Sequence, residues 1–146
     1  YVYKKIKKFA SEQKLSINSL KILIVGIAFK GIPETSDIRG SASVELLKIL
    51  GNPNNLSIKD YVIDANQLAH LNINIVEDSV GTIVKNYDAI IYMNNHHKNT
   101  TENVLTNLKN INKPFLFFDG WNMFNQVEVE SIDHISYSTM GYMTKS

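Results

Sequence analysis

The sequence predicts an α/β domain built on a mostly parallel β-sheet. Short apolar runs that are typical of buried strands alternate along the chain with segments of helical periodicity. The 146 residues are enough for one domain with a sizeable core, and the content of 44% apolar and 20% charged residues is that of an ordinary globular protein. Strands that alternate with helices are joined by crossover connections, which place parallel strands side by side with helices on both faces.

The composition argues against several classes of partner. A formal net charge of +1 gives no long-range field that would select nucleic acid or anionic lipid. The lysine cluster at residues 4–8 is interpreted as the solvated face of a helix, because no aromatic or arginine residues interleave it. Cysteine is absent, which excludes disulfides, thiolate metal ligands and a cysteine nucleophile within these residues. No apolar run approaches the roughly 20 residues of a membrane span. We therefore expect neither nucleic acid nor a membrane as a partner.

The chain is expected to begin with a helix and a linker. Val2, Ile6 and Phe9 recur at helical spacing, so residues 1–13 are predicted to form a short amphipathic helix, with a linker at residues 15–20. Because the sequence lacks an initiator methionine and starts within a helical pattern, we expect it to be part of a longer protein.

The remaining elements follow in alternation. Residues 21–28 are a nearly continuous apolar run, typical of a strand buried on both faces. Ser41 can cap the next helix, which Gly51 and Pro53 end. Further strands are predicted at residues 56–62, 73–76, 88–93, 114–118 and 132–137, and further helices at 65–71, 80–86 and 101–108. The predicted fold is a Rossmann-like three-layer sandwich with a mostly parallel sheet, preceded by the end of a helix.

The loop at residues 29–41 is the expected position of a ligand site. Ligands of open α/β sheets bind beyond the carboxyl ends of the strands, where the strand order reverses, and the first strand normally lies at such a point. The loop is long and holds Lys30, Arg39, Glu34 and Asp37. A lysine, an arginine and a helix N-terminus suit a diphosphate. The residues alone also allow a solvated loop whose charges pair with one another.

A standard dinucleotide fingerprint is missing from this position. The fingerprint needs Gly-x-Gly-x-x-Gly after the first strand, so that the backbone can touch the pyrophosphate. Here Gly26 is followed by Ile27, Ala28 and Phe29. This domain is therefore not expected to hold NAD in the manner of a standard Rossmann domain.

Four segments resemble, in order, the C-terminal domain of the UDP-glucose/GDP-mannose dehydrogenase family. Val-Gly-Ile-Ala-Phe-Lys, followed by Glu-Thr-Ser-Asp-Ile-Arg-Gly-Ser, is similar to its signature loop. Ile-Lys-Asp resembles the end of the family's second strand. Asp-Ala-Ile-Ile-Tyr-Met-Asn-Asn-His resembles a family strand that leads to a histidine. Phe-Phe-Asp-Gly resembles a late family strand that ends in aspartate. The signature loop covers residues 25–30 and 34–41, and the other three segments lie at residues 58–60, 88–96 and 117–120.

The resemblance covers about residues 20–140 and implies a function. Members of the family oxidise the C6 alcohol of a nucleotide sugar to a carboxylate with NAD, which is bound mainly by an N-terminal domain that also carries a catalytic cysteine. Residues 1–19 would be the end of the central dimerisation helix and a linker, and residues 20–146 the nucleotide-sugar-binding domain. The resemblance implies a cytoplasmic enzyme of polysaccharide biosynthesis that is a homodimer when complete, and a fragment that is inactive alone.

The resemblance also assigns site residues. Phe29 and Lys30 would contact the nucleotide sugar, and Arg39 would reach the NAD cofactor across the domain cleft; no catalytic residue and no metal ligand is expected in this chain. Lys30 and Arg39 lie farther apart than in the commoner family spacing, which we interpret as subgroup variation. Many members have an arginine where this chain has Trp121. Either the substrate contact is made differently here, or Trp121 offers a stacking surface.

Other polar residues near strand ends are interpreted as structural. His96 and His97 are adjacent and have no local third ligand, so a metal site is not expected, and His96 is interpreted as a hydrogen-bonded side chain near the cleft. Asp60 is expected to cap a turn. Asp119 and Gly120 are expected to shape a turn rather than to perform acid–base chemistry.

Two other classes of function remain as alternatives. The first is a stand-alone nucleotide-binding or signalling α/β module, although a phosphoacceptor module would need an acidic pair where Phe29 and Lys30 follow the first strand. The second is a structural dimerisation domain, which would not require an elaborate charged loop. Within the dehydrogenase hypothesis, the sequence leaves open whether the substrate is UDP-glucose, a UDP-N-acetylhexosamine or GDP-mannose.

Overall fold

The computed structural model describes residues 2–26, 42–50, 55–61, 66, 73–94, 96–101 and 103–139, with the backbone alone at residues 42–44. The loop predicted at residues 29–41 and nearly all of the helix predicted at 65–71 lie outside this part of the chain.

A six-stranded, fully parallel sheet forms the centre of the molecule. Its strands lie in the order β3-β2-β1-β4-β5-β6, so the central strand β1 pairs with β2 on one side and with β4 on the other. The predicted Rossmann-like α/β fold is confirmed. The strands are β1 (Ile22–Val25), β2 (Leu56–Lys59), β3 (Asn74–Ile75), β4 (Ala89–Tyr92), β5 (Phe115–Asp119) and β6 (Ile135–Thr139).

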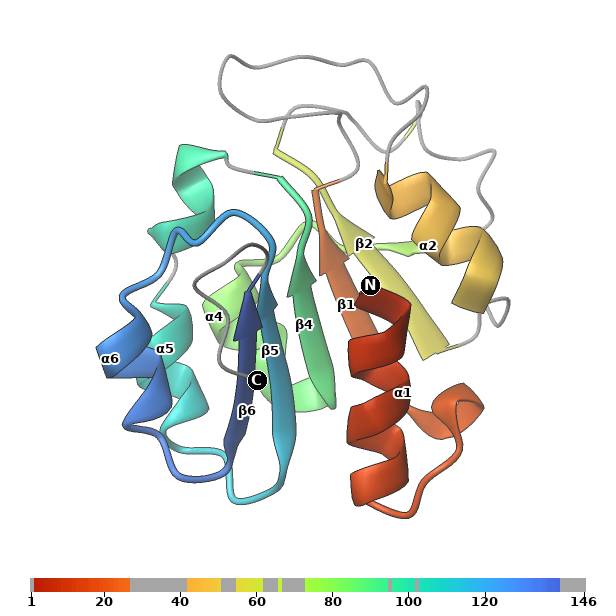
Figure 1. The fold of residues 1–146 in the computed structure, drawn as a ribbon. Coiled ribbons are helices and arrows are strands. Elements are labelled where there is room, and N and C mark those ends of the chain that lie inside the picture. Colours follow the sequence, from red (N-terminus) through yellow and green to blue (C-terminus); the bar gives the residue numbers. More distant parts are fainter. Residues whose placement is uncertain are drawn as a thin grey trace.

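Helices cover both faces of the sheet and make the fold three-layered (Figure 1). One face carries α1 (Val2–Glu12) and α2 (Ala42–Leu50), and the other carries α4 (Val80–Ile83), α5 (Val104–Leu108) and α6 (Gln126–Glu130). Short 3-10 helices form η1 (Ile17–Ser19), η4 (Val84–Asn86) and η5 (His97–Thr100). Among the residues that the structure describes, no helix is long and apolar enough to cross a bilayer.

Alternate residues of β1 face two separate core clusters. Ile22 and Ile24 pack beneath α1 and α2, while Leu23 and Val25 pack beneath α4 and α5. A strand that is buried on both faces needs apolar side chains at every position, which explains the continuous apolar run in the sequence. The first helix belongs to the same packing, because Ile6, a residue of α1, is fully buried against this sheet.

Two elements start three residues later than the sequence predicts. The helix predicted to begin at residue 101 begins instead at Val104, because Asn103 has a left-handed φ of 53° and residues 97–100 form η5. The last strand starts at Ile135 rather than at residue 132, since Ile132 packs into the core before the strand.

The helix α6 was not predicted. It spans Gln126–Glu130, which is too short for the 3.6-residue period to be visible, and its Val127 is 80% exposed while Val129 is buried. The side chain of Asn125 caps it by accepting a hydrogen bond from the Glu128 N–H at 3.1 Å. Asn125, a residue type that is favoured at the start of helices, was therefore a signal in the sequence that could have indicated α6.

The buried position of β1 leads to a stability prediction. Ile24→Ala should lower the free energy of unfolding by roughly 2–5 kcal/mol, because it leaves a cavity in the centre of the sheet. The matched change Ile49→Ala, on α2 where the side chain is 57% exposed, should alter it by less than about 0.5 kcal/mol. Urea denaturation of both variants measures the difference, and equal losses would contradict this description of the core.

Candidate functional site

The order of the strands reverses between β1 and β4. The chain runs outward from β1 to β2 and β3, and then returns to the other side of β1 to form β4, β5 and β6. Ligands of doubly wound folds bind at this switch point, beyond the carboxyl ends of the strands. All strands end at the same edge, here called the carboxyl edge (Figure 1). Gly26, Asn94 and Gly120 follow β1, β4 and β5 there.

Gly26 and Asn94 are packed directly against each other at the switch point. Gly26 has a φ of +101°, and a Cβ atom on it would lie 2.5 Å from the Asn94 Cγ. The Gly26 N–H donates to the Lys59 carbonyl at 2.8 Å, and the Met93 N–H donates to the Val25 carbonyl at 2.9 Å. Only glycine fits this position, since both the backbone conformation and the neighbouring amide exclude a side chain.

Asn94 organises the connection that follows β4. It is 1% exposed, and its Oδ1 accepts hydrogen bonds from the His96 N–H at 3.3 Å and from the Asn99 Nδ2 at 3.2 Å. Asn99 also donates to the Asn94 carbonyl at 3.0 Å. Asn94 lies within the motif at residues 88–96 but is not among the site residues that the sequence predicts. A polar residue directly after a buried strand was the signal that could have found it.

His96 is a buried structural side chain, as predicted. Its Nδ1 accepts a hydrogen bond from the Lys98 N–H at 3.2 Å and so caps η5. The His96 ring stacks on Tyr61 with a centroid distance of 5.2 Å and on His97 with one of 4.5 Å. In the described part of the chain, no group of three or more histidine, aspartate, glutamate or cysteine residues could hold a metal ion.

Lys59 fixes the part of the carboxyl edge that lies near β2. Its Nζ donates to the carbonyls of Glu77 at 3.2 Å and Asp78 at 2.7 Å, and it lies 5.1 Å from the Tyr61 ring centroid. These bonds connect β2 to the segment after β3. Asp60 follows directly on β2, and its role as a turn cap stays a prediction.

Asp119 and Gly120 shape the turn after β5, as the sequence analysis predicted. The buried Asp119 carboxylate accepts hydrogen bonds from the Trp121 N–H at 3.1 Å and the Phe124 N–H at 2.8 Å. A Cβ atom on Gly120 would lie 2.7 Å from the Tyr92 carbonyl oxygen, which excludes a side chain there. Burial raises the pKa of Asp119 above its ordinary value of 3.8, although the backbone N–H groups oppose this shift.

The same turn carries Trp121 over the end of β4. The indole Nε1 donates to the Met93 carbonyl at 3.2 Å, and the side chain is 47% exposed. Trp121 therefore connects the ends of two neighbouring strands at the carboxyl edge.

The predicted ligand residues Phe29, Lys30 and Arg39 lie outside the described residues. The two ends of their loop are described: it follows Gly26 at the switch point and leads to the N-terminus of α2. The assignment of these three residues stays a prediction.

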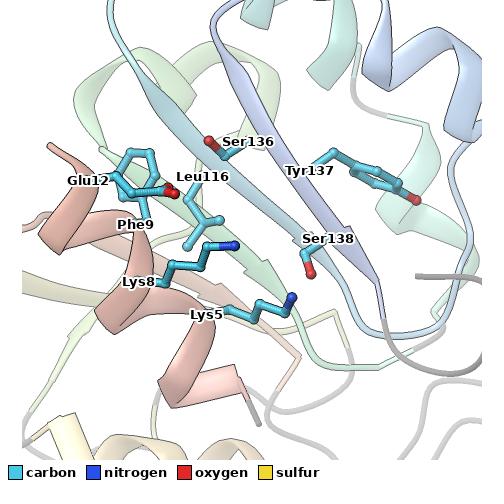
Figure 2. Close-up of a pocket in the computed structure, with 8 residues that line it drawn as sticks. All are labelled: Lys5, Lys8, Phe9, Glu12, Leu116, Ser136, Tyr137 and Ser138. Carbon is cyan, nitrogen blue, oxygen red and sulfur yellow. The ribbon is translucent and has the colours of Figure 1, made fainter. Parts of the chain in front are cut away.

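A separate hollow of about 290 Å³ lies between α1 and the outer strands, away from the switch point (Figure 2). Figure 2 shows Lys5 and Lys8 pointing from α1 toward Ser138 on β6. Glu12 lines the same hollow. Its charges are therefore mixed, and it belongs to the flank of the sheet rather than to the carboxyl edge.

The raised pKa of Asp119 gives a prediction for stability against pH. Between pH 3.8 and the raised pKa, the native state holds a proton that the unfolded state has lost, so stability falls as pH rises through this interval. Asp119→Asn cannot titrate. Urea denaturation from about pH 4 to about pH 7 should therefore show the wild type losing stability relative to this variant. A relative gain by the wild type would mean that the backbone N–H groups outweigh burial.

Comparison with known proteins places this fold in a family. Residues 23–126 match the family described as "UDP-glucose/GDP-mannose dehydrogenase family, UDP binding domain". Among solved structures, the chain is similar to UDP-D-ManNAc dehydrogenase from Pyrococcus horikoshii, with a TM-score of 0.64 and 17% identity over 92% of this chain and 28% of that chain. At this identity the likeness shows the fold. A comparison with curated proteins gave no match. Because the family match spans most of its length, the chain belongs to the UDP-glucose/GDP-mannose dehydrogenase family, within the UDP binding domain.

Proposed function

We propose that this chain is the nucleotide-sugar-binding domain of an NAD-dependent nucleotide-sugar 6-dehydrogenase, which oxidises the C6 alcohol of its substrate to a carboxylate. The observation that carries the proposal is the position of the two described segments that the charged loop joins. In a chain of this family, residues 27–41 connect the switch point to the N-terminus of α2. A diphosphate bound there would meet the positive end of the helix dipole as well as the side chains of the loop.

The proposed roles of the loop residues follow from their chemistry. Lys30 supplies a positive charge to the diphosphate, and Phe29 packs against a ring of the nucleotide sugar. Arg39 directs its planar guanidinium group at the phosphates of NAD. The substrate is a UDP-sugar of the UDP-glucose or UDP-N-acetylhexosamine type.

The described residues do not fit an NAD molecule held in the standard Rossmann manner. Such binding needs open backbone after β1, but here the Asn94 side chain packs against Gly26, with its Cγ 2.5 Å from where a Cβ would lie. NAD is therefore assigned mainly to another domain of the complete enzyme, with Arg39 as the contribution of this chain. When bound, NAD would accept the hydride from the sugar.

The alternative of a signalling module has less support. The family match favours a dehydrogenase domain, and the first strand leads to Phe29 and Lys30 rather than to the acidic pair of a phosphoacceptor site.

Binding of UDP tests the proposal on this chain. UDP should perturb the amide resonances of Gly26, Asn94 and the loop at 29–41 before those of the opposite edge. Lys30→Ala should weaken UDP about tenfold to a hundredfold, because a charge-assisted hydrogen bond is lost.

The control is Lys85→Ala, which removes the same charge from an exposed position before β4, at the opposite edge. Its UDP affinity, measured by calorimetry, should equal that of the wild type. Equal weakening by both substitutions, or resonance shifts confined to the opposite edge, would refute the site.

A second prediction concerns the complete enzyme. Arg39→Ala should raise chiefly the KM for NAD, and Lys30→Ala chiefly the KM for the nucleotide sugar, each by roughly tenfold to a hundredfold. Steady-state kinetics with each substrate varied in turn measures this separation. If each substitution raises both constants equally, the two residues do not serve different ligands.

A further inference from the structure

Trp121 is unusual among the large apolar residues of this chain. It is the one tryptophan in the sequence, yet its side chain is 47% exposed. The other exposed large apolar side chains in the described residues are aliphatic, namely Leu15, Ile49 and Val127. Among the residues that the structure describes, the one large apolar side chain that is both aromatic and exposed therefore lies at the carboxyl edge, where ligands of this fold bind.

The indole ring is held in place from both ends. Its Nε1 donates to the Met93 carbonyl at 3.2 Å, and its backbone N–H donates to the Asp119 Oδ1 at 3.1 Å. The turn beneath it is fixed as well, because the Gly120 N–H donates to the Tyr92 carbonyl at 2.9 Å. An anchored ring loses little conformational entropy when a ligand binds to it.

These hydrogen bonds also determine which interactions the Trp121 ring can make with a ligand. The indole has a single polar hydrogen, and the Met93 carbonyl already accepts it. The exposed surface of Trp121 can therefore recognise a ligand through its π face and apolar edge, but not as a hydrogen-bond donor. The ligand group that fits such a surface is a flat ring that stacks on the indole.

The position of the ring suits one part of a bound nucleotide. Trp121 follows β5 and reaches β4, which is the neighbour of β1 at the switch point. Adjacent strands lie about 4.8 Å apart, so the indole is roughly 5–10 Å from the end of β1. A diphosphate at the start of the loop and a ring on Trp121 would be separated by about the length of one sugar unit.

We propose that Trp121 is the platform on which the uracil base of the nucleotide stacks. This inference rests on the proposed function, and it names a residue that contacts the base of the nucleotide rather than its phosphates. The base is favoured over the hexose because uracil is planar and is present in UDP itself, the ligand for which the family's domain is described. Stacking on an aromatic side chain stabilises a bound base through its π face.

The single tryptophan permits a direct test on the 146-residue chain. A stacked base quenches indole emission, so UDP and UMP should quench the fluorescence in a saturable manner. Pyrophosphate and glucose 1-phosphate should not. Quenching by glucose 1-phosphate, with none by UMP, would overturn the proposal in favour of the sugar.

Substitutions separate stacking from a structural role. Trp121→Ala should weaken UDP about fivefold to a hundredfold by calorimetry, and leave pyrophosphate binding unchanged. Trp121→Phe retains a ring but loses the bond to Met93, and should retain most of the UDP affinity. Val127→Ala removes another exposed apolar side chain and should change neither ligand.

The possible failures are distinguishable. If the wild type binds UDP and Trp121→Ala binds it equally well, the platform is refuted while the proposed function stands. If Trp121→Ala weakens pyrophosphate as much as UDP, the residue acts on the structure of the edge and the platform is again refuted. If the wild type binds no UDP at all, the proposed function fails and the platform with it.

Discussion

β1 is hydrogen-bonded to a strand on each side and has core side chains on each face, and the rest of the fold depends on its burial. Ile22 and Ile24 need a helical layer on one side, and Leu23 and Val25 need another on the opposite side. Short chain connections can provide both layers only if each strand is followed by a crossover helix, which makes the sheet parallel. The reversal of strand order beside β1 is therefore a consequence of covering this strand on both faces, and it produces the switch point.

At the switch point, close packing replaces the open glycine loop of a dinucleotide-binding domain. The Asn94 amide occupies the space beside Gly26 and is itself held by the backbone of His96 and by Asn99. A polar side chain that is buried and hydrogen-bonded in this way fixes the geometry of the strand end, because breaking its bonds would leave unpaired groups in the interior. Under the proposed function, a ligand at this edge would meet a fixed strand end and would be recognised by the side chains around it.

The turn after β5 shows two opposing effects at one residue. The Asp119 carboxylate is buried, which costs solvation energy and raises its pKa, yet it orders the turn through two backbone N–H groups. Burial raises the pKa of Tyr137 to about 12, and the negative charge of the Asp119 carboxylate adds to this shift. The result of this arrangement is a Trp121 ring held at the carboxyl edge.

The sequence by itself determined the alternation of strands and helices, the parallel sheet and the family resemblance, because apolar periodicity and the loop motif are local properties of the chain. It named Phe29, Lys30 and Arg39 through that motif, and their roles stay predictions. Only the tertiary structure decided that Asn94 fills the switch point and that Trp121 is anchored on the carbonyl of Met93, 28 positions away. It also decided the presence of α6 and the start of α5. The features of Asn94 and Trp121 depend on contacts between strand ends that are distant in sequence. The start of α5 depends on one backbone angle, and α6 is too short to show a helical period, so none of them leaves a periodic pattern in the chain.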